Sequence, residues 1–423
     1  MMRVVGCIAE FNPFHNGHAY FLEQAKRQTQ SDFCVVVMSG NFVQRGAPAI
    51  ADKYVRAKAA LLHGADLVIE LPAIFSLSSA EGFARAGVKL LTQLGLVDVL
   101  CFGAEGSVAP ILENAADTFL KEPDDYRMVL KQQLSKGQSY PAARTRALFT
   151  TASAFRSPTG PDDRIQAEQI LSSPNNILGI EYIKACRQLQ SDMRPLAIPR
   201  LQSDYADTKL RAPYASATAI RLHMKRHGIT EQLSSVIPKR ALALLRQLPC
   251  QDAWMDESSC YPGLMLRLLS ETPETLKRHP HTPEWLANRL SHVWQSSTSF
   301  DDLVKRCKVK QITYTAISRA LFHCLLNSDR ELFEHYHELS VMFPYIRILG
   351  VRREAQPLLS ACARNAGVHL ITNPAKADSL LDDSTAAALW KSDLYAAHVY
   401  ECIQANLRHT PFTHEYTRKF LIV

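Results

Sequence analysis

The run FNPFHNGH, residues 11–18, places two imidazoles and a glycine directly after a short apolar segment. His15 and His18 are three residues apart, so at the start of a helix they can face one ligand. Gly17 lets the backbone approach a phosphate closely. A helix N-terminus attracts anions, and donors placed there stabilise charge that develops during displacement at phosphorus. The pattern favours nucleotide binding; a zinc-binding pair or a surface pair is the alternative.

A second phosphate cradle is predicted at SATAIR, residues 216–221. Ser216 is a candidate N-cap, and the hydroxyls of Ser216 and Thr218 with the guanidinium of Arg221 suit a phosphate. An ordinary capped helix start explains the same residues. The chain has neither a Walker-type lysine loop nor GxGxxG, so a nucleotide would be handled by the HxGH arrangement.

Further polar residues follow other apolar runs. FGAE, residues 102–105, contains Gly103, against whose backbone an adenine or a ribose could lie. SGNFVQRGAPA and DKYVR supply candidates for phosphate or substrate contacts, namely Asn41, Gln44, Arg45, Lys53 and Arg56. Taken alone, a solvated loop or a plain turn glycine explains these stretches equally well.

The elements that must position these residues alternate along the first half of the chain. Short, β-branched runs predict strands at 3–11, 32–40, 65–72, 97–103 and 193–200. Helical spacing predicts helices at 18–30, 52–64, 79–95, 172–189 and 216–226. Such alternation implies βαβ units and a parallel sheet, with ligands at the carboxyl ends of its strands. We predict an α/β fold: a doubly wound, Rossmann-like domain over residues 1–225, with a helical insertion at about 108–172 that contains the loop RSPTGPDDR.

The second half of the chain has a different pattern. Amphipathic helices are predicted at 238–248, 264–270, 283–294, 315–326 and 394–407, with brief strand-like runs at 345–351 and 367–373. We therefore predict a mainly α-helical C-terminal region over residues 226–423.

Composition narrows the class of protein. A net charge of +7 permits a polyanionic partner without requiring one. The 10 cysteines form no CxxC pair, so we predict no zinc ribbon and no metal ligand set. Neither a signal peptide nor an apolar run long enough to span a bilayer is evident. We expect a reduced, cytoplasmic protein with no membrane partner, and nothing implies a protein partner.

Several motifs together resemble one family. They are VVGCIAEFNPFHNGH, VVMSGNFVQRGAPAIADKYVRAKAALLHGADLVIELP, LCFGAE, SPNNILGIEYIKA and SATAIR. The set resembles the tRNA(Met) cytidine acetate ligase family of the HxGH nucleotidyltransferase superfamily, and the resemblance continues more weakly into residues 309–326 and 345–351.

The resemblance implies an activity. ATP activates acetate as acetyl-adenylate, and the acetyl group passes to N4 of the wobble cytidine, position 34, of elongator tRNA(Met), giving N4-acetylcytidine. Mg²⁺ is expected with the ATP. By position, the implied ATP-binding residues are Ile8, Ala9, Glu10, Phe11, Asn12, Pro13, Phe14, His15, Asn16, Gly17, His18, Ala19, Tyr20, Phe21, Gly103, Asn175 and Arg200. His15, His18 and Arg221 are our candidates to stabilise the transition state.

The RNA partner would require basic and aromatic residues in the later region. Candidates for backbone contact are Arg211, Lys225, Arg226, Lys239, Arg240, Lys305, Arg306, Lys308, Lys310, Arg319 and Arg347, and candidates for base stacking are Tyr314, Phe343 and Tyr345. Solvated helix faces and core aromatics are the alternative. Two other functions remain open: a small-molecule adenylyltransferase acting on a phosphorylated cofactor precursor, and a non-catalytic RNA-binding protein with a relic nucleotide fold.

Overall fold

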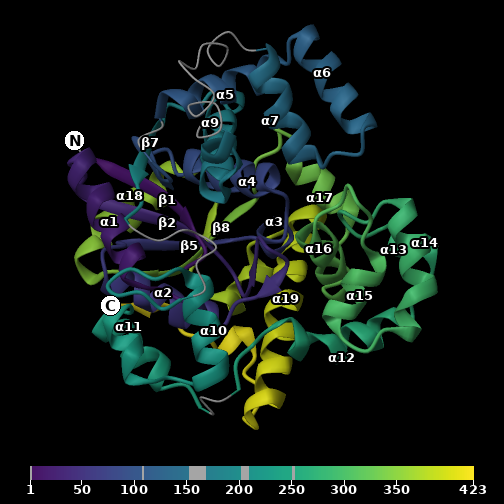
Figure 1. Cartoon of the computed structure of the whole chain (residues 1–423). Helices are drawn as coiled ribbons and strands as arrows, with labels where there is room; N and C mark the ends of the chain where they lie inside the picture. Colours follow the sequence, from purple (N-terminus) through teal and green to yellow (C-terminus); the bar gives the residue numbers. More distant parts are fainter. Residues whose placement is uncertain (1, 107–108, 152–167, 202–208, 250–252) are drawn as a thin grey trace.

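The computed structural model describes residues 2–106, 109–151, 168–201, 209–249 and 253–423. Its main sheet has the strand order β10-β8-β5-β2-β1-β6-β7, with β9 paired to β8 (Figure 1). The strands are β1 (Val4–Ala9), β2 (Phe33–Ser39), β5 (Leu67–Leu71), β6 (Val99–Ala104), β7 (Arg194–Pro199), β8 (Tyr345–Val351), β9 (His369–Ile371) and β10 (Leu421–Ile422). A small hairpin, β3 (Phe42–Val43) with β4 (Ala47–Pro48), lies in the loop after β2.

The helices of the first half are α1 (Asn16–Thr29), α2 (Lys53–Leu62), α3 (Ala73–Ser76), α4 (Ala80–Gln93), α5 (Ala109–Lys121), α6 (Asp124–Ser135), α7 (Tyr140–Thr151), α9 (Pro174–Gln188) and α10 (Ala217–His227). Those of the second half are α11 (Lys239–Arg246), α12 (Glu257–Leu268), α13 (Pro273–Leu276), α14 (Glu284–Val293), α15 (Phe300–Cys307), α16 (Tyr314–Leu325), α17 (Arg330–His337), α18 (Gln356–Asn365) and α19 (Ser384–Arg408), with the 3-10 turn η6 (Glu415–Thr417) near the end.

The first half of the chain forms a parallel, doubly wound sheet, which confirms the predicted fold class. Strands β5, β2, β1, β6 and β7 pair in parallel in that order. The chain moves outward from β1 through β2 to β5 and then returns to the other side of β1 as β6. The crevice between the carboxyl ends of β1 and β6 is therefore the topological switch point, where open α/β sheets bind ligands.

Both faces of the sheet are covered because alternate strand residues point to opposite sides. Val35 and Val37 of β2 pack in one core cluster with residues of α4, α5 and α9. Val36 and Met38 of the same strand pack in the other with residues of α1, α2 and α11. Burial on both faces explains why the strand sequences read as continuous apolar runs without alternation.

The second half of the chain also contributes to this sheet. β8 pairs antiparallel with β5, and β9 and β10 pair in parallel with β8. The strand-like runs noted at 345–351 and 367–373 contain β8 and β9. Helices α12, α14, α15, α16 and α19 share a third core cluster. The division of the chain at residue 225 stays a prediction, but it is not a boundary of the sheet, since β8 completes an edge that begins in the first half.

Helices α5, α6 and α7 form a layer beside α9 (Figure 1, top). Their described residues are helical, as predicted for the insertion, whereas the predicted loop RSPTGPDDR lies outside the described residues. Two ion pairs connect the insertion to α9. Arg144 of α7 lies 2.5 Å from Glu181 of α9, and Arg187 of α9 lies 2.5 Å from Asp117 of α5.

Candidate nucleotide site

A cavity lies at the switch point between β1 and β6. It is lined by residues from the start of α1, the ends of β6 and β7, the start of α9 and the start of α10. The predicted residues that line it are Ile8, Ala9, Glu10, Phe11, Asn12, His15, Gly17, His18, Tyr20, Phe21, Gln44, Arg45, Gly103, Asn175, Arg200, Ser216, Thr218 and Arg221. Segments more than 200 residues apart in the chain thus meet at the predicted edge of the sheet.

The two histidines form a reciprocal capping box at the start of α1. His15 is the N-cap, and its Nδ1 accepts a hydrogen bond from the Gly17 backbone N–H at 3.1 Å. Nδ1 of His18 accepts a hydrogen bond from the His15 backbone N–H at 3.3 Å. Because both Nδ1 atoms act as acceptors, each neutral ring carries its proton on Nε2. Nε2–H is therefore the donor that each ring can offer to a ligand.

The rings of His15 and His18 lie face to face, with centroids 3.7 Å apart. Burial, followed by the charges of Arg200 and Arg221, lowers the pKa of His15 to about 3. Burial, followed by His15 and Arg200, also holds the pKa of His18 well below its usual value. Both rings are therefore neutral at pH 7. They supply directed hydrogen bonds, while the positive charge of the cavity resides on the arginines.

The His15 ring lies close to the backbone of Gly17. A Cβ at residue 17 would lie 3.0 Å from Cε1 of His15 and 3.1 Å from its Nδ1. Such a group would press on the atom that caps the helix. The glycine in HNGH therefore permits the cap geometry itself, in addition to leaving room for a ligand.

The start of α10 brings the second predicted cradle to the cavity. Oγ of Ser216 accepts a hydrogen bond from the Ala219 backbone N–H at 3.0 Å, as expected for an N-cap. Arg221 donates to the backbone oxygen of Asn12 at 2.7 Å and to Oγ1 of Thr218 at 3.3 Å. Burial, followed by the charge of Arg45, lowers the pKa of Arg221 to about 10. Arg221 therefore stays cationic at pH 7 and connects the two cradles.

The loop after β2 reaches the cavity through Gln44 and Arg45. The Gln44 backbone N–H donates to Oε1 of Glu10 at 2.9 Å, and its side-chain Nε2 donates to the backbone oxygen of Ser78 at 3.3 Å. Gly46, at φ +76°, lies against the backbone of Arg319, where a Cβ would come within 2.6 Å of the amide nitrogen. Helix α16 thus supports the loop that carries Gln44 and Arg45.

Asn41, Lys53 and Arg56 support this loop from behind and do not line the cavity. Oδ1 of Asn41 accepts from the Lys53 backbone N–H at 2.8 Å. The Arg56 guanidinium is buried and donates to the backbone oxygens of Ala51, Glu10, Ser39 and Gly40. The structure thus corrects the prediction that these three residues are phosphate or substrate contacts. The buried cations of Lys53 and Arg56 already have partners within the protein, and the Asn41 amide oxygen accepts from Lys53.

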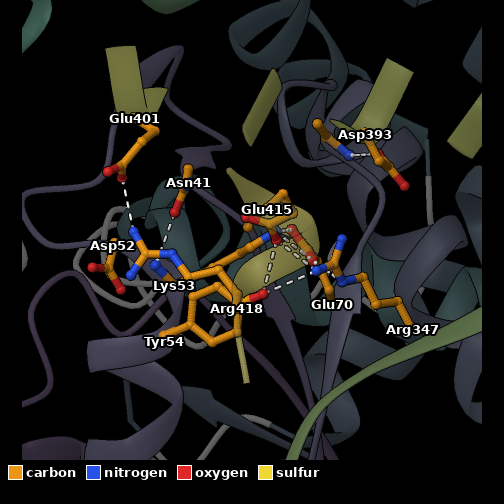
Figure 2. Close-up of polar contacts among 12 residues, drawn as sticks. Asn41, Asp52, Lys53, Tyr54, Glu70, Arg347, Asp393, Glu401, Glu415 and Arg418 are labelled. Atoms are coloured by element: carbon orange, nitrogen blue, oxygen red, sulfur yellow. Dashed lines mark hydrogen bonds and ion pairs between the residues drawn. The ribbon is translucent and has the colours of Figure 1, made fainter. Parts of the chain in front are cut away.

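Lys53 belongs to a buried charge cluster (Figure 2). Its Nζ lies 2.8 Å from a Glu70 oxygen and 2.7 Å from Glu415. Arg347 lies 3.0 Å from Glu70 and 2.5 Å from Glu415. Arg347 was a candidate RNA contact, as were Phe343 and Tyr345; all three side chains are buried, so the structure corrects these predictions.

The other basic candidates differ in exposure. Arg319 and Tyr314 are half-buried. The exposed ones are Arg211, Lys225, Arg226, Lys239, Arg240, Lys305, Arg306, Lys308 and Lys310. Among them, Lys225 pairs with Asp256 at 3.1 Å, Lys305 with Asp301 at 2.5 Å and Arg306 with Asp302 at 2.8 Å. The exposed residues remain available to a polyanion.

Four residues of the implied ATP-binding run are absent from the cavity lining: Pro13, Phe14, Asn16 and Ala19. Asn16 instead donates to the backbone oxygens of Pro213 and Ser235, at 2.9 and 3.0 Å, and so ties α1 to the segments that flank α10. Phe14 packs against the rings of Phe11 and His18. Asn16 and Phe14 therefore support the turn before α1 through contacts outside the cavity.

Apolar walls of the cavity escaped the sequence analysis. They are Phe83, Phe102, Leu178, Tyr182, Ile198, Pro199, Leu201, Tyr214, Ala215 and Ala217. These residues are mainly apolar, and the sequence gives no signal that separates an apolar cavity wall from the core. Glu105, in the FGAE run, has no local signal of its role, because its hydrogen bond to Asn175 joins residues 70 positions apart.

One group of potential metal ligands lies outside the cavity, among the C-terminal helices. The ligand atoms of Glu271, His279 and Cys324 lie within 4.8 Å of one another. Arg267 already pairs with Glu271 at 2.7 Å, and Nδ1 of His279 lies 2.8 Å from the Ser328 backbone oxygen. The carboxylate therefore has a cationic partner, and the group is a closed hydrogen-bonded cluster. In the described part of the chain, no helix combines the length and hydropathy needed to cross a bilayer.

Comparisons with known proteins identify the family. The model of the HIGH Nucleotidyl Transferase family matches residues 2–415. The tRNA(Met) cytidine acetate ligase of Acetivibrio thermocellus is 36% identical over 379 residues, which are 88% of each chain. That of Clostridium kluyveri is 34% identical over 427 residues, covering 100% of this chain and 99% of the relative.

Solved structures of Thermotoga maritima TmcAL have the same architecture over their full length. The apo form superposes with a TM-score of 0.90 at 28% identity, and the form bound with alpha-thio ATP with a TM-score of 0.87 at 27% identity. Each comparison covers 100% of both chains. With its HxGH capping box in a cavity at the switch point, the chain belongs to the HIGH nucleotidyl transferase family and, within it, to the tRNA(Met) cytidine acetate ligases.

Proposed function

We propose that this protein is an ATP-dependent acetate ligase that acetylates N4 of the wobble cytidine, position 34, of elongator tRNA(Met). The observation that carries the proposal is the convergence of the His15–His18 capping box, Arg200 and Arg221 on one cavity. The relatives' names and the alpha-thio ATP bound to the Thermotoga maritima protein support it. The proposed location is the cytoplasm, where tRNA and ATP are available.

The first step joins two anions, acetate and ATP. A carboxylate oxygen of acetate forms a bond to the α-phosphorus, the bond from that phosphorus to the bridging oxygen breaks, and pyrophosphate leaves. Negative charge accumulates on the α-phosphate oxygens during displacement, where Nε2–H of His15 and His18 would donate hydrogen bonds. Arg221, cationic and fixed by Asn12 and Thr218, would offset the same charge.

Acetate is already ionised at neutral pH, so this step needs no general base. Holding both anions in a cavity with cationic walls converts a bimolecular encounter into a positioned reaction. Mg²⁺ bound to the triphosphate would find an oxygen ligand at Glu10, the acidic residue of the cavity lining, and would neutralise charge on the leaving pyrophosphate.

The second step transfers the acetyl group. The N4 amine of the cytidine attacks the acetyl carbon, the bond to the phosphate oxygen breaks, AMP leaves, and the amine loses a proton. A wobble base lies in a single-stranded loop and can be turned outward at modest cost. Exposed basic residues such as Arg211 and Arg240 would contact the RNA backbone.

The test is an incubation of the protein with ATP, acetate and elongator tRNA(Met), followed by mass spectrometry of the nucleosides. We expect N4-acetylcytidine that depends on both ATP and acetate. Labelled acetate and ATP without RNA should give acetyl-AMP, which a cofactor adenylyltransferase would not form. Absence of both products from a protein that binds ATP would refute the proposal.

A further inference from the structure

The end of β6 and the start of α9 are joined by a compact set of hydrogen bonds. The backbone N–H of Glu105 donates to Oδ1 of Asn176 at 2.9 Å, and Nδ2 of Asn176 donates to the backbone oxygens of Glu105 at 3.1 Å and Ile170 at 2.8 Å. The Asn176 side chain is fully buried. Asn176 therefore fixes the backbone of Glu105 relative to the first turn of α9.

The neighbouring amide, Asn175, faces the Glu105 side chain. Nδ2 of Asn175 donates to Oε1 of Glu105. A carboxylate offers acceptor oxygens only, so the nitrogen of the amide must be the atom turned towards it. Oδ1 of Asn175 then lies on the opposite side of the amide, without a hydrogen bond from any residue that the structure describes. Asn175 lines the cavity, so this oxygen is the side-chain acceptor that it has left for a ligand.

The other carboxylate oxygen, Oε2 of Glu105, is buried and has no hydrogen-bond partner in the described part of the chain. Burial lowers the pKa of Arg200, and the charge of Glu105 opposes that effect. Arg200 lines the cavity, and a Cβ on Gly103 would lie 3.4 Å from its Cγ. Glu105 therefore acts on two cavity-lining groups, Asn175 through a hydrogen bond and Arg200 through its charge.

We propose that Glu105 is a positioning residue that holds the Asn175 amide so that Oδ1 accepts a hydrogen bond from the nucleoside half of ATP. An acceptor disfavours phosphate, which itself offers acceptor oxygens, and the donors suited to phosphate lie at the starts of α1 and α10. The group recognised is a hydrogen-bond donor of the nucleoside, either a ribose hydroxyl or the 6-amino group of adenine. This inference rests on the proposed use of ATP.

Two substitutions test whether Glu105 acts by orienting the Asn175 amide or through the charge and size of its own side chain. Glu105→Gln keeps an acceptor for Nδ2 of Asn175, whereas Glu105→Met has a similar length and no comparable acceptor. We expect Glu105→Met to raise the dissociation constant of ATP about ten-fold, the usual effect of losing one hydrogen bond, with Glu105→Gln within about two-fold of the native protein. At saturating ATP, the rate of acetate-dependent pyrophosphate exchange should stay unchanged in both.

Calorimetry with ATP, 2′-deoxy-ATP, 3′-deoxy-ATP and purine riboside triphosphate identifies which hydrogen-bond donor of the nucleoside Asn175 recognises. The native protein should bind one of these analogues about ten-fold more weakly than ATP, and Glu105→Met should not weaken that analogue further. Thermal unfolding of the apo variants measures any general destabilisation.

Equal binding of all the analogues by the native protein would overturn the inference. It would also be overturned if Glu105→Gln lost as much affinity for ATP as Glu105→Met. These titrations contain no acetate and no RNA. A protein that discriminates among the nucleotides as expected yet forms no acetyl-AMP would refute the proposed function and leave the role of Glu105 standing.

Discussion

The Lys53 ammonium lies 2.7 Å from the Glu415 carboxylate, although the two residues are 362 positions apart in the chain. Tyr54 also donates to Glu415 at 2.8 Å, and the Arg347 guanidinium lies 2.5 Å from the same oxygen (Figure 2). Glu70 completes a cluster of two cations and two anions, all of them buried. The cluster joins the start of α2 to β5, β8 and η6, and so connects the last residues of the chain to the loop that carries Gln44 and Arg45.

Replacing Glu415 by glutamine should destabilise the protein strongly. Lys53 and Arg347 would keep Glu70 as their only carboxylate partner within this cluster, and removing one partner of a buried ion pair costs about 3 kcal/mol. Urea unfolding of the apo protein measures the loss. Arg306→Ala is the matched control, because the pair of Arg306 with Asp302 is solvent-exposed and should be worth less than about 1 kcal/mol. Equal effects of the two substitutions would contradict the importance of the cluster.

Substitutions at His15 should separate capping from chemistry. His15→Ala removes the acceptor for the Gly17 N–H and should cost about 1 kcal/mol of stability. His15→Asn keeps a capping oxygen but lacks Nε2–H, so it should restore most of that stability. Both variants should lower acetyl-adenylate formation about 100-fold, because the donor to the α-phosphate is lost in each. An active His15→Asn protein would limit the role of His15 to capping.

His18→Ala should abolish adenylate formation and leave tRNA affinity nearly unchanged. The ring of His18 lies in the nucleotide cavity, stacked on His15, and the exposed basic residues lie elsewhere on the surface. A pyrophosphate-exchange assay and a filter-binding assay with elongator tRNA(Met) measure the two properties separately. Full exchange activity in this variant would contradict the assigned phosphate contact.

Acid should weaken the fold through half-buried histidines whose pKa the folded structure lowers. Burial, followed by Arg319 and His337, lowers the pKa of His281 to about 4, and burial, followed by Arg85, lowers that of His337 to about 4. In the unfolded chain both rings titrate near 6.5. Between these values the unfolded state binds more protons, so stability should fall as pH decreases from about 6.5 to about 4.

Urea midpoints measured from pH 7 to pH 4.5 test this dependence. His337→Gln should reduce the slope in this range because one of the titrating groups is absent. A slope identical to that of the native protein would remove His337 as a source of the effect. His292, which is exposed on α14, provides a control position as His292→Gln.

Affinity for tRNA should fall steeply with salt, since contacts from Lys and Arg to phosphates release counterions. Lys239 and Arg240 are exposed at the start of α11, and the segment just before α11 hydrogen-bonds to α1 through Asn16 and Val236. Replacing either by glutamine should reduce the slope of log affinity against log salt by about one unit. Lys305→Gln, which removes a residue paired with Asp301, serves for comparison. A flat salt dependence of the native protein would exclude backbone recognition by these cations.

The sequence by itself determined the features that depend on neighbouring residues. The strand, turn and helix around HNGH, the helix start at SATAIR and the alternation that produces a parallel sheet all follow from local spacing, and the structure confirms each. Parallel strands share one orientation, so their carboxyl ends, with Glu10, Gly103 and Arg200, come to one edge without any detailed knowledge of packing.

Only the tertiary structure decided which polar groups face the cavity and which face each other. Lys53 and Arg56 are of residue types that commonly bind phosphate. In the structure, however, Lys53 pairs with Glu70 and Glu415, and Arg56 donates to backbone oxygens. The orientation of the Asn175 amide depends on Glu105, and the last strands of the sheet come from the second half of the chain. A buried charge or amide pairs with a group that tertiary packing places next to it. That group can be hundreds of residues away in the sequence, so no local pattern predicts it.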